Sequence, residues 1–264
     1  MPPLTHEWTL WSLMNGLPAL VATVAFLLYP PFDFKFAWNV EDRRSGIFLG
    51  TGFLLRALLF LHVIMAKSWG EIRWLNYGNV VFAAVLLGVT LIWGDHFHWR
   101  RWIAIIWLYL YIEEPVWMLT LLPQAQAAAG SAIVPGGEVL LLTKLVLWLE
   151  AAVMLAAGLY LWFVPKMENP KWWPWKPDLV SARIMAGFPL AWVAWALTLA
   201  VAPSWGEARG GVMLDVAWLG AIFLSTIIFH RLFDLRSRIT QVYLAVAGVL
   251  MVLLAAAYVM QGTA

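Results

Sequence analysis

Eight stretches of the chain are apolar enough and long enough for each to cross a lipid bilayer as a helix. A spanning helix needs about 20 consecutive, mostly apolar residues. We expect the spans at residues 8–29, 46–66, 75–93, 102–122, 139–164, 182–202, 213–230 and 239–260. Only 12% of the residues are charged, against about 25% in a soluble domain. The sequence therefore predicts an all-α, polytopic membrane protein with eight transmembrane helices.

Basic residues gather in the loops on one side of this predicted bundle. The loops after the first, third, fifth and seventh spans hold twelve Lys and Arg residues, and the opposite side holds three. The twelve are Lys35, Arg43, Arg44, Arg100, Arg101, Lys166, Lys171, Lys176, Arg183, Arg231, Arg236 and Arg238. Loops rich in Lys and Arg stay in the cytoplasm. We therefore expect both termini outside. A purely topogenic role is favoured for these charges, with contact to anionic membrane lipids as the alternative.

An internal repeat divides the chain into two halves. The pattern S-W-G-E-x-R occurs at residues 68–73 and again at 204–209, and Trp38 and Trp175 precede the two copies at nearly equal separations. We infer a first half at 1–130 and a second half at 131–264. Four spans per half give both halves the same orientation, which predicts a parallel repeat. Each copy is interpreted as a tight loop in which Glu and Arg pair around the Gly, with a ligand site as the alternative.

Short aromatic motifs in both halves resemble a family of uncharacterised bacterial multi-span membrane proteins. The likeness covers roughly residues 36–115 and 172–235. It implies a duplicated fold in the bacterial inner (plasma) membrane, and it implies no activity. The motifs are Phe36-Ala37-Trp38, Phe48-Leu49-Gly50, Trp69, Arg73, Tyr109, Trp173-Pro174-Trp175 and Ala182-Arg183.

A narrower likeness concerns two adjacent acids. Ile112-Glu113-Glu114 is similar to the end of the Pro-aliphatic-Glu-Glu signature of membrane-type lycopene cyclases, although Tyr111 stands where that family has Pro. This resemblance, four residues at most, implies chemistry on an isoprenoid.

The same two acids lie in the middle of the fourth span and are expensive to bury in a bilayer. Counting residues at about 1.5 Å each places Arg56 and Glu150 near the same depth. Because Arg has no accessible neutral form, we expect Arg56 to pair with one or two of Glu113, Glu114 and Glu150. Tyr109 lies one turn before Glu113 on the same helix face. These five residues form the predicted buried polar centre, with Glu113 and Glu114 as candidate catalytic acids.

Several classes of site are excluded or weak. The absence of Cys excludes disulfides, iron–sulfur clusters and thiolate zinc sites. A scattered net charge of +2 argues against nucleic acid as a partner. Asp95, His96 and His98 form either a surface metal site or a solvated loop. His62 is the only His well inside a span, so no haem-ligating pair is expected. We predict no cofactor, with a lipid or isoprenoid as the alternative. Interfacial belts are expected to explain many of the 19 Trp residues.

Three functions fit this pattern. The first is a non-enzymatic subunit of a larger membrane complex, with other membrane proteins and lipids as partners and with structural buried charges. The second is a proton-coupled carrier that uses Arg56, Glu113, Glu114 and Glu150. The third is an isoprenoid- or lipid-handling enzyme with Glu113 or Glu114 as the acid. The sequence favours the first, because the loops are short and no catalytic signature is present.

Overall fold

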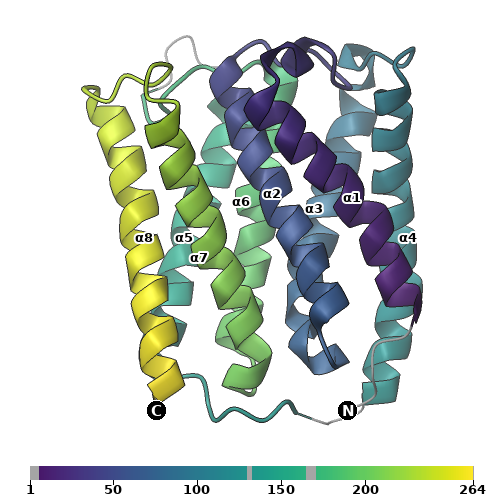
Figure 1. The fold of residues 1–264 in the computed structure, drawn as a ribbon, viewed down its shortest axis with the longest axis vertical. Coiled ribbons are helices and arrows are strands. Elements are labelled where there is room, and N and C mark those ends of the chain that lie inside the picture. Colours follow the sequence, from purple (N-terminus) through teal and green to yellow (C-terminus); the bar gives the residue numbers. More distant parts are fainter. Residues whose placement is uncertain (1–5, 130–132, 165–170, 264) are drawn as a thin grey trace.

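A computed structural model describes residues 6–129, 133–164 and 171–263. Within these residues the chain forms eight α-helices that lie along the long axis of one bundle (Figure 1). All eight are long and apolar enough to span a membrane, as the sequence predicts. They are α1 (His6–Leu28), α2 (Arg43–Met65), α3 (Arg73–Ile92), α4 (Trp102–Ala129), α5 (Leu141–Phe163), α6 (Leu179–Ala200), α7 (Trp205–Ile228) and α8 (Arg238–Thr263).

Four helices form the centre of the bundle. The helix α3 packs along α6, and α2 packs along α7. In the most apolar stretch of α6, 78% of the residues are buried, against 22% in α8. The helices α1, α4, α5 and α8 therefore lie outside and present apolar side chains outward. The start of α1 and the end of α8 lie at the same end of the bundle (Figure 1).

Two Asp residues cap central helices in the same way. The side chain of Asp42 accepts a hydrogen bond from the backbone N–H of Arg44 at the start of α2 (2.8 Å). The side chain of Asp178 accepts one from the N–H of Ser181 in α6 (2.9 Å). A carboxylate at this position satisfies backbone donors that have no partner inside the helix. Asp42 thus caps the second of the first four helices, and Asp178 caps the second of the last four.

The helix α7 begins earlier than the sequence predicts. The expected span starts at residue 213, whereas α7 starts at Trp205. The second S-W-G-E-x-R copy is therefore the first turns of a helix, and its interpretation as a loop is wrong. The first copy forms a 3-10 turn, η2 (Trp69–Glu71), before α3. The residues that precede these two elements, Ser68 and Ser204, nevertheless share nearly the same extended backbone conformation.

The Trp residues are mostly part of the core. Eleven of those in the described chain are buried, including Trp38 and Trp175. The expectation that interfacial belts explain many of the Trp residues does not hold for these eleven, which pack inside the bundle. The indole N–H of Trp38 donates to the hydroxyl of Ser181 in α6 (2.9 Å), and that of Trp175 donates to the hydroxyl of Ser45 in α2 (2.8 Å). A buried indole N–H usually has such a partner, and here each hydrogen bond joins distant parts of the chain.

Candidate functional site

A buried ion pair joins α2 to α4 in the middle of the bundle. Arg56 Nη2 donates to Glu114 Oε1 (2.7 Å), and Arg56 Nη1 donates to Oδ1 of Asn79 in α3 (2.5 Å). The side chains of Arg56 and Glu114 are 8% and 0% exposed. The rings of Phe60 and Phe82 lie 4.9 and 4.5 Å from the guanidinium carbon, in cation–π contact. This is one of the pairings that the sequence predicts for Arg56.

Glu113 and Tyr109 lie differently from Glu114. Glu113 is buried, and Asn15 of α1 donates to its Oε2 (3.4 Å). Tyr109 is 53% exposed on the outer face of α4, so its placement in the polar centre is wrong. The tyrosine that faces inward is Tyr111, which is 4% exposed and near both Arg56 and Glu114. Two residues turn a helix by about 200°, which sends the two tyrosines to opposite sides.

Glu150 belongs to a second polar centre. It accepts a hydrogen bond from the indole of Trp192 in α6 (3.1 Å) and lies against Asp215 of α7. Both acids are fully buried, and Asp215 lies within interaction range of both Glu150 and the indole of Trp192. The expectation that Glu150 shares a centre with the paired Arg56 is therefore wrong. Because α7 starts at Trp205 and not at the expected residue 213, Asp215 lies near the middle of its helix instead of near its start.

The two polar centres occupy corresponding places in the sequence. The number of residues from Arg56 to Trp192 equals the number from Asn79 to Asp215. Glu150 follows Asn15 by an offset only one position shorter. One centre therefore contains an ion pair, and the other contains two acids and an indole.

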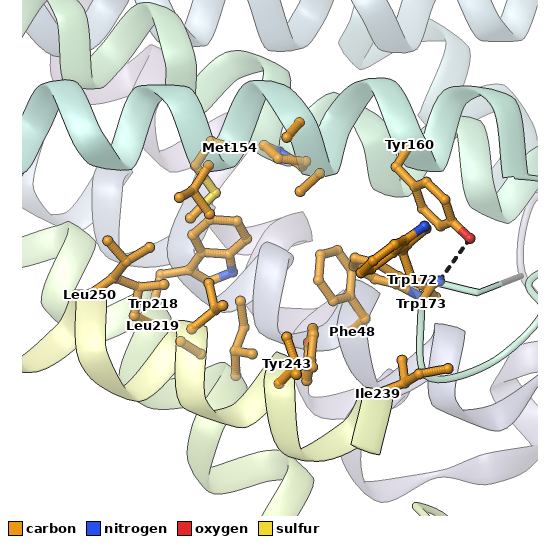
Figure 2. Close-up of a pocket in the computed structure, with 18 of the residues that line it drawn as sticks. Phe48, Met154, Tyr160, Trp172, Trp173, Trp218, Leu219, Ile239, Tyr243 and Leu250 are labelled. Atoms are coloured by element: carbon orange, nitrogen blue, oxygen red, sulfur yellow. Dashed lines mark hydrogen bonds between the residues drawn. The ribbon is translucent and has the colours of Figure 1, made fainter. Parts of the chain in front are cut away.

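Two cavities lie beside these helices. The first cavity, about 340 Å³, lies between α1, α2 and α4, and its polar lining consists of Asn15, Arg56, Tyr111 and Glu114. The second cavity, about 480 Å³, lies between α5, α7 and α8 and is shown in Figure 2. Both volumes fall within the range of about 300–1,000 Å³ that is usual for ligand pockets. The walls of both cavities are predominantly apolar.

The two cavities are lined at matching positions. Each α8 residue that lines the second cavity lies a constant number of residues after an α4 residue that lines the first. The α5 residues paired with α1 residues lie after them at a constant separation that is one residue shorter. The α4 and α8 pairs are Ile103 and Ile239, Ile106 and Val242, Trp107 and Tyr243, Leu110 and Val246, Tyr111 and Ala247, and Glu114 and Leu250. The α1 and α5 pairs are Pro18 and Val153, Ala19 and Met154, Val21 and Ala156, and Ala22 and Ala157.

Two cations near the loop end of the first cavity are bound within the protein. Arg43 donates to Asp33 of the 3-10 helix η1 (Pro30–Phe34) at 3.1 Å and to the carbonyl of Leu27 at 3.0 Å. Arg101 donates to the carbonyl of Phe36, a lining residue, at 2.7 Å. Burial raises the pKa of the Asp33 carboxyl to about 6, although the charge of Arg43 opposes the shift.

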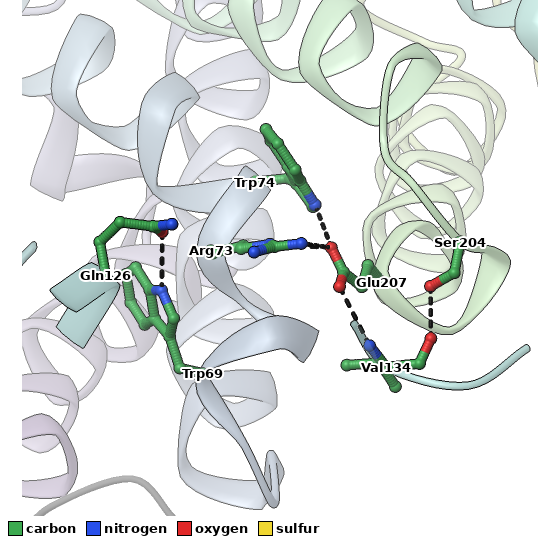
Figure 3. A network of polar contacts seen from close by, with 7 residues as sticks. All are labelled: Trp69, Arg73, Trp74, Gln126, Val134, Ser204 and Glu207. Carbon is green, nitrogen blue, oxygen red and sulfur yellow. Dashed lines mark hydrogen bonds and ion pairs between the residues drawn. The ribbon is translucent and has the colours of Figure 1, made fainter. Parts of the chain in front are cut away.

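A further buried ion pair joins the two S-W-G-E-x-R copies (Figure 3). Arg73 of the first copy donates through Nε to Glu207 of the second (2.8 Å), and the indole of Trp74 donates to the same oxygen (2.6 Å). The other oxygen of Glu207 accepts the backbone N–H of Val134, in the segment between the halves (3.0 Å). The predicted pairing of Glu and Arg within one copy is therefore wrong. In the first copy, Glu71 accepts from Ser68 (3.2 Å).

The remaining candidates do not converge on one site. Asp95 and His96 are 4.0 Å apart and exposed, while His98 contacts Asn39 (3.0 Å). Among the described residues, no three potential ligands come together around a metal position. Arg183 lies inside α6, buried between the rings of Trp93 and Trp162 at 5.2 Å each, so its assignment to a loop is wrong.

Comparisons of the chain with protein-family models, curated proteins and solved structures find no match. The functional argument therefore depends on the geometry of the two cavities and the polar groups around them.

Proposed function

We propose that the protein is an integral membrane protein that binds an isoprenoid or similar lipid, carrying one hydroxyl or carbonyl group, in the first cavity. The observation that carries this proposal is the position of the polar groups. The cavity is apolar along its walls, and the Arg56–Glu114 ion pair and the Tyr111 side chain contribute to its lining. A ligand that fits must be mostly apolar and must have one polar group.

The rim of the first cavity explains how such a ligand would enter. Leu17 and Val21 of α1 are 58% and 64% exposed, and Trp102 and Ile106 of α4 are 72% and 40% exposed. These side chains lie on the apolar outer surface, which faces acyl chains in a bilayer. The ligand would therefore reach the cavity from the lipid.

The polar groups that line the first cavity are better suited to binding a ligand than to acid catalysis. Among the described residues, the hydroxyl of Tyr111 makes no hydrogen bond, and it is free to bond with a hydroxyl or carbonyl of the ligand. Glu114, the acid that lines the cavity, is held by Arg56. A carboxylate in an ion pair carries no proton to donate, so the Glu114 arrangement favours recognition over protonation of the ligand.

The architecture that we propose is a parallel repeat of residues 1–130 and 131–264. The reciprocal hydrogen bonds support it, because Trp38 donates to Ser181 in the other half and Trp175 donates back to Ser45. The matched cavity linings support it independently. We further propose a bacterial inner membrane location with both termini outside, on the basis of the basic loops. The roles as a subunit of a larger complex and as a proton-coupled carrier stay predictions.

The test compares farnesol with farnesene, which has the same carbon skeleton without the hydroxyl group. Native mass spectrometry of the detergent-solubilised protein would measure the binding of each. We expect farnesol to bind about tenfold more tightly, because one hydrogen bond near a charged pair distinguishes the two molecules.

A cavity-filling pair locates the site. Ala22→Phe places a ring in the first cavity and should abolish farnesol binding, whereas Ala157→Phe, at the corresponding position of the second cavity, should leave it intact. Equal binding of farnesol and farnesene, or unchanged farnesol binding by Ala22→Phe, would contradict the proposal.

A further inference from the structure

The second cavity differs from the first in its deep lining. Met154, Trp218 and Leu250 lie together, away from the end of the cavity at Trp172 and Ile239 (Figure 2). Where the first cavity has the carboxylate of Glu114, the second has Leu250. The described deep lining of the second cavity therefore contains no charged group and suits a hydrocarbon chain.

The charges of the second cavity are two cations at its mouth. Lys171 and Arg238 line it, and the described lining contains no acidic residue. Both cations are exposed, and neither makes an ion pair with any residue that the structure describes. Arg238 is the first residue of α8 and corresponds to Trp102 at the start of α4. At this position of the mouth, the second cavity has a cation where the first cavity has an indole.

The segment that carries Lys171 is held against the cavity. The backbone N–H of Trp172 donates to the hydroxyl of Tyr160 in α5 (3.0 Å), as Figure 2 shows. Trp173 is buried and packs edge-on against Tyr243 of α8, with ring centroids 5.5 Å apart. Trp172 is 77% exposed, as suits a side chain at the level of lipid headgroups. Both contacts hold the mouth close to the apolar lining.

From this arrangement we propose that the second cavity binds an anionic phospholipid. One acyl chain occupies the apolar interior, and the phosphate lies at the mouth with Lys171 and Arg238. The charge complementarity selects this occupant, because a neutral hydrocarbon would leave both cations unused and a zwitterionic lipid would bring its own cation to them. The lipid comes from the leaflet on the side of the basic loops. This site is separate from the one proposed for farnesol.

The experiment uses the full chain in nanodiscs made from equal amounts of phosphatidylglycerol and phosphatidylcholine with identical acyl chains. Native mass spectrometry after release from the nanodisc identifies the lipid that stays bound. We expect one retained lipid, with phosphatidylglycerol preferred about tenfold, because the two basic residues at the mouth attract an anionic headgroup.

Matched variants separate the cavity from the general basic surface. Lys171→Gln/Arg238→Gln should remove the headgroup preference, whereas Arg236→Gln, in the same loop and outside the lining, should preserve it. Ala157→Phe should remove the retained lipid, and Ala22→Phe should leave it in place. Farnesol binding by the Lys171→Gln/Arg238→Gln, Arg236→Gln and Ala157→Phe variants shows that these proteins are folded. For Ala22→Phe, which should not bind farnesol, the retained lipid itself shows that the protein is folded.

Three results would overturn the assignment. The first is equal retention of the two lipids by the unmodified protein. The second is an undiminished preference in Lys171→Gln/Arg238→Gln. The third is a loss of the phosphatidylglycerol preference in Arg236→Gln that is as large as the loss in the double variant. That result would show that the whole basic surface, and not this cavity, selects the lipid.

Discussion

The first and second cavities share a framework and differ in where they carry charge. Their linings correspond at nearly constant offsets in the sequence, and both have an alanine at the same place, Ala22 or Ala157. Two exchanges account for much of the difference between the cavities. Glu114 in the first corresponds to Leu250 in the second, and Trp102 corresponds to Arg238. A few positions thus change the charge of each lining, and under the proposals above these positions decide which part of a ligand each cavity recognises.

The polar centres next to the cavities differ in the same manner. Arg56 bonds Asn79 and Glu114, whereas Trp192 bonds Glu150 beside Asp215. A cation in one half thus corresponds to a neutral donor in the other. The first centre depends on the pairing of opposite charges, and the second depends on an indole N–H, so the two should respond unequally to substitution.

The largest expected effect is at the Arg56 ion pair. Arg56→Met leaves Glu114 buried without its cation and should lower the free energy of unfolding by about 3–5 kcal/mol. Trp192→Phe, at the corresponding position, removes one hydrogen bond and should cost about 1–2 kcal/mol. Thermal unfolding of the detergent-solubilised variants would rank them.

A double variant tests the cause of this difference. Arg56→Met/Glu114→Met removes both charges and should recover much of the stability lost in Arg56→Met. If the double variant is no more stable than the single one, the loss came from packing around Arg56 and not from an unpaired carboxylate.

The two S-W-G-E-x-R copies give a second, somewhat smaller contrast. Glu207 is fully buried and binds Arg73, Trp74 and Val134, so Glu207→Gln should cost about 2–3 kcal/mol. Glu71, at the matching position, is only partly buried and accepts a bond from Ser68, so Glu71→Gln should cost less than about 1 kcal/mol. Similar losses of thermal stability in both variants would show that Glu71 and Glu207 contribute equally to the contact between the two copies.

A third contrast compares tyrosines of the two cavities in the binding of farnesol. Tyr111→Phe should weaken farnesol binding about tenfold and leave farnesene unaffected, because it removes only a hydroxyl group from the first cavity. Tyr243→Phe removes a hydroxyl group from the second cavity and serves as the control. The same mass-spectrometric titration checks both variants. An equal loss for farnesol and farnesene would mean that Tyr111 shapes the cavity and does not bond the ligand.

The helices were predictable because the length of an apolar run is a local property of the chain. The pairing of Arg56 with an acid was predictable from the cost of burying an unpaired guanidinium. The choice of Glu114 over Glu150 was not predictable, because it depends on how each helix is rotated about its axis. Tyr109 and Tyr111 show this directly, since the two side chains face opposite sides of α4 although only one residue separates them.

The position of Asp215 could not be predicted for a different reason. The start of α7 contains Glu207 and Arg209, and charged residues near a span are usually assigned to a loop. Glu207 lies inside the bundle because Arg73 of the other half neutralises it. That partner is distant in the sequence, and an interaction of such range leaves no local pattern.

The smallest expected effect is a change of stability with pH, and it comes from the loop end of the first cavity. There Arg43 is bound to Asp33, while Lys171 and Arg238 of the second cavity make no ion pair within the described chain. The pKa of Asp33, about 6 in the folded protein, exceeds its ordinary value of 3.8. The folded state therefore binds more protons than the unfolded state between these values, and its stability falls as the pH rises through 6. Between about pH 5 and pH 7 the loss amounts to about 1 kcal/mol. Asp33→Asn should remove this slope in thermal unfolding measurements, and an identical slope in the variant would assign the titration to another group.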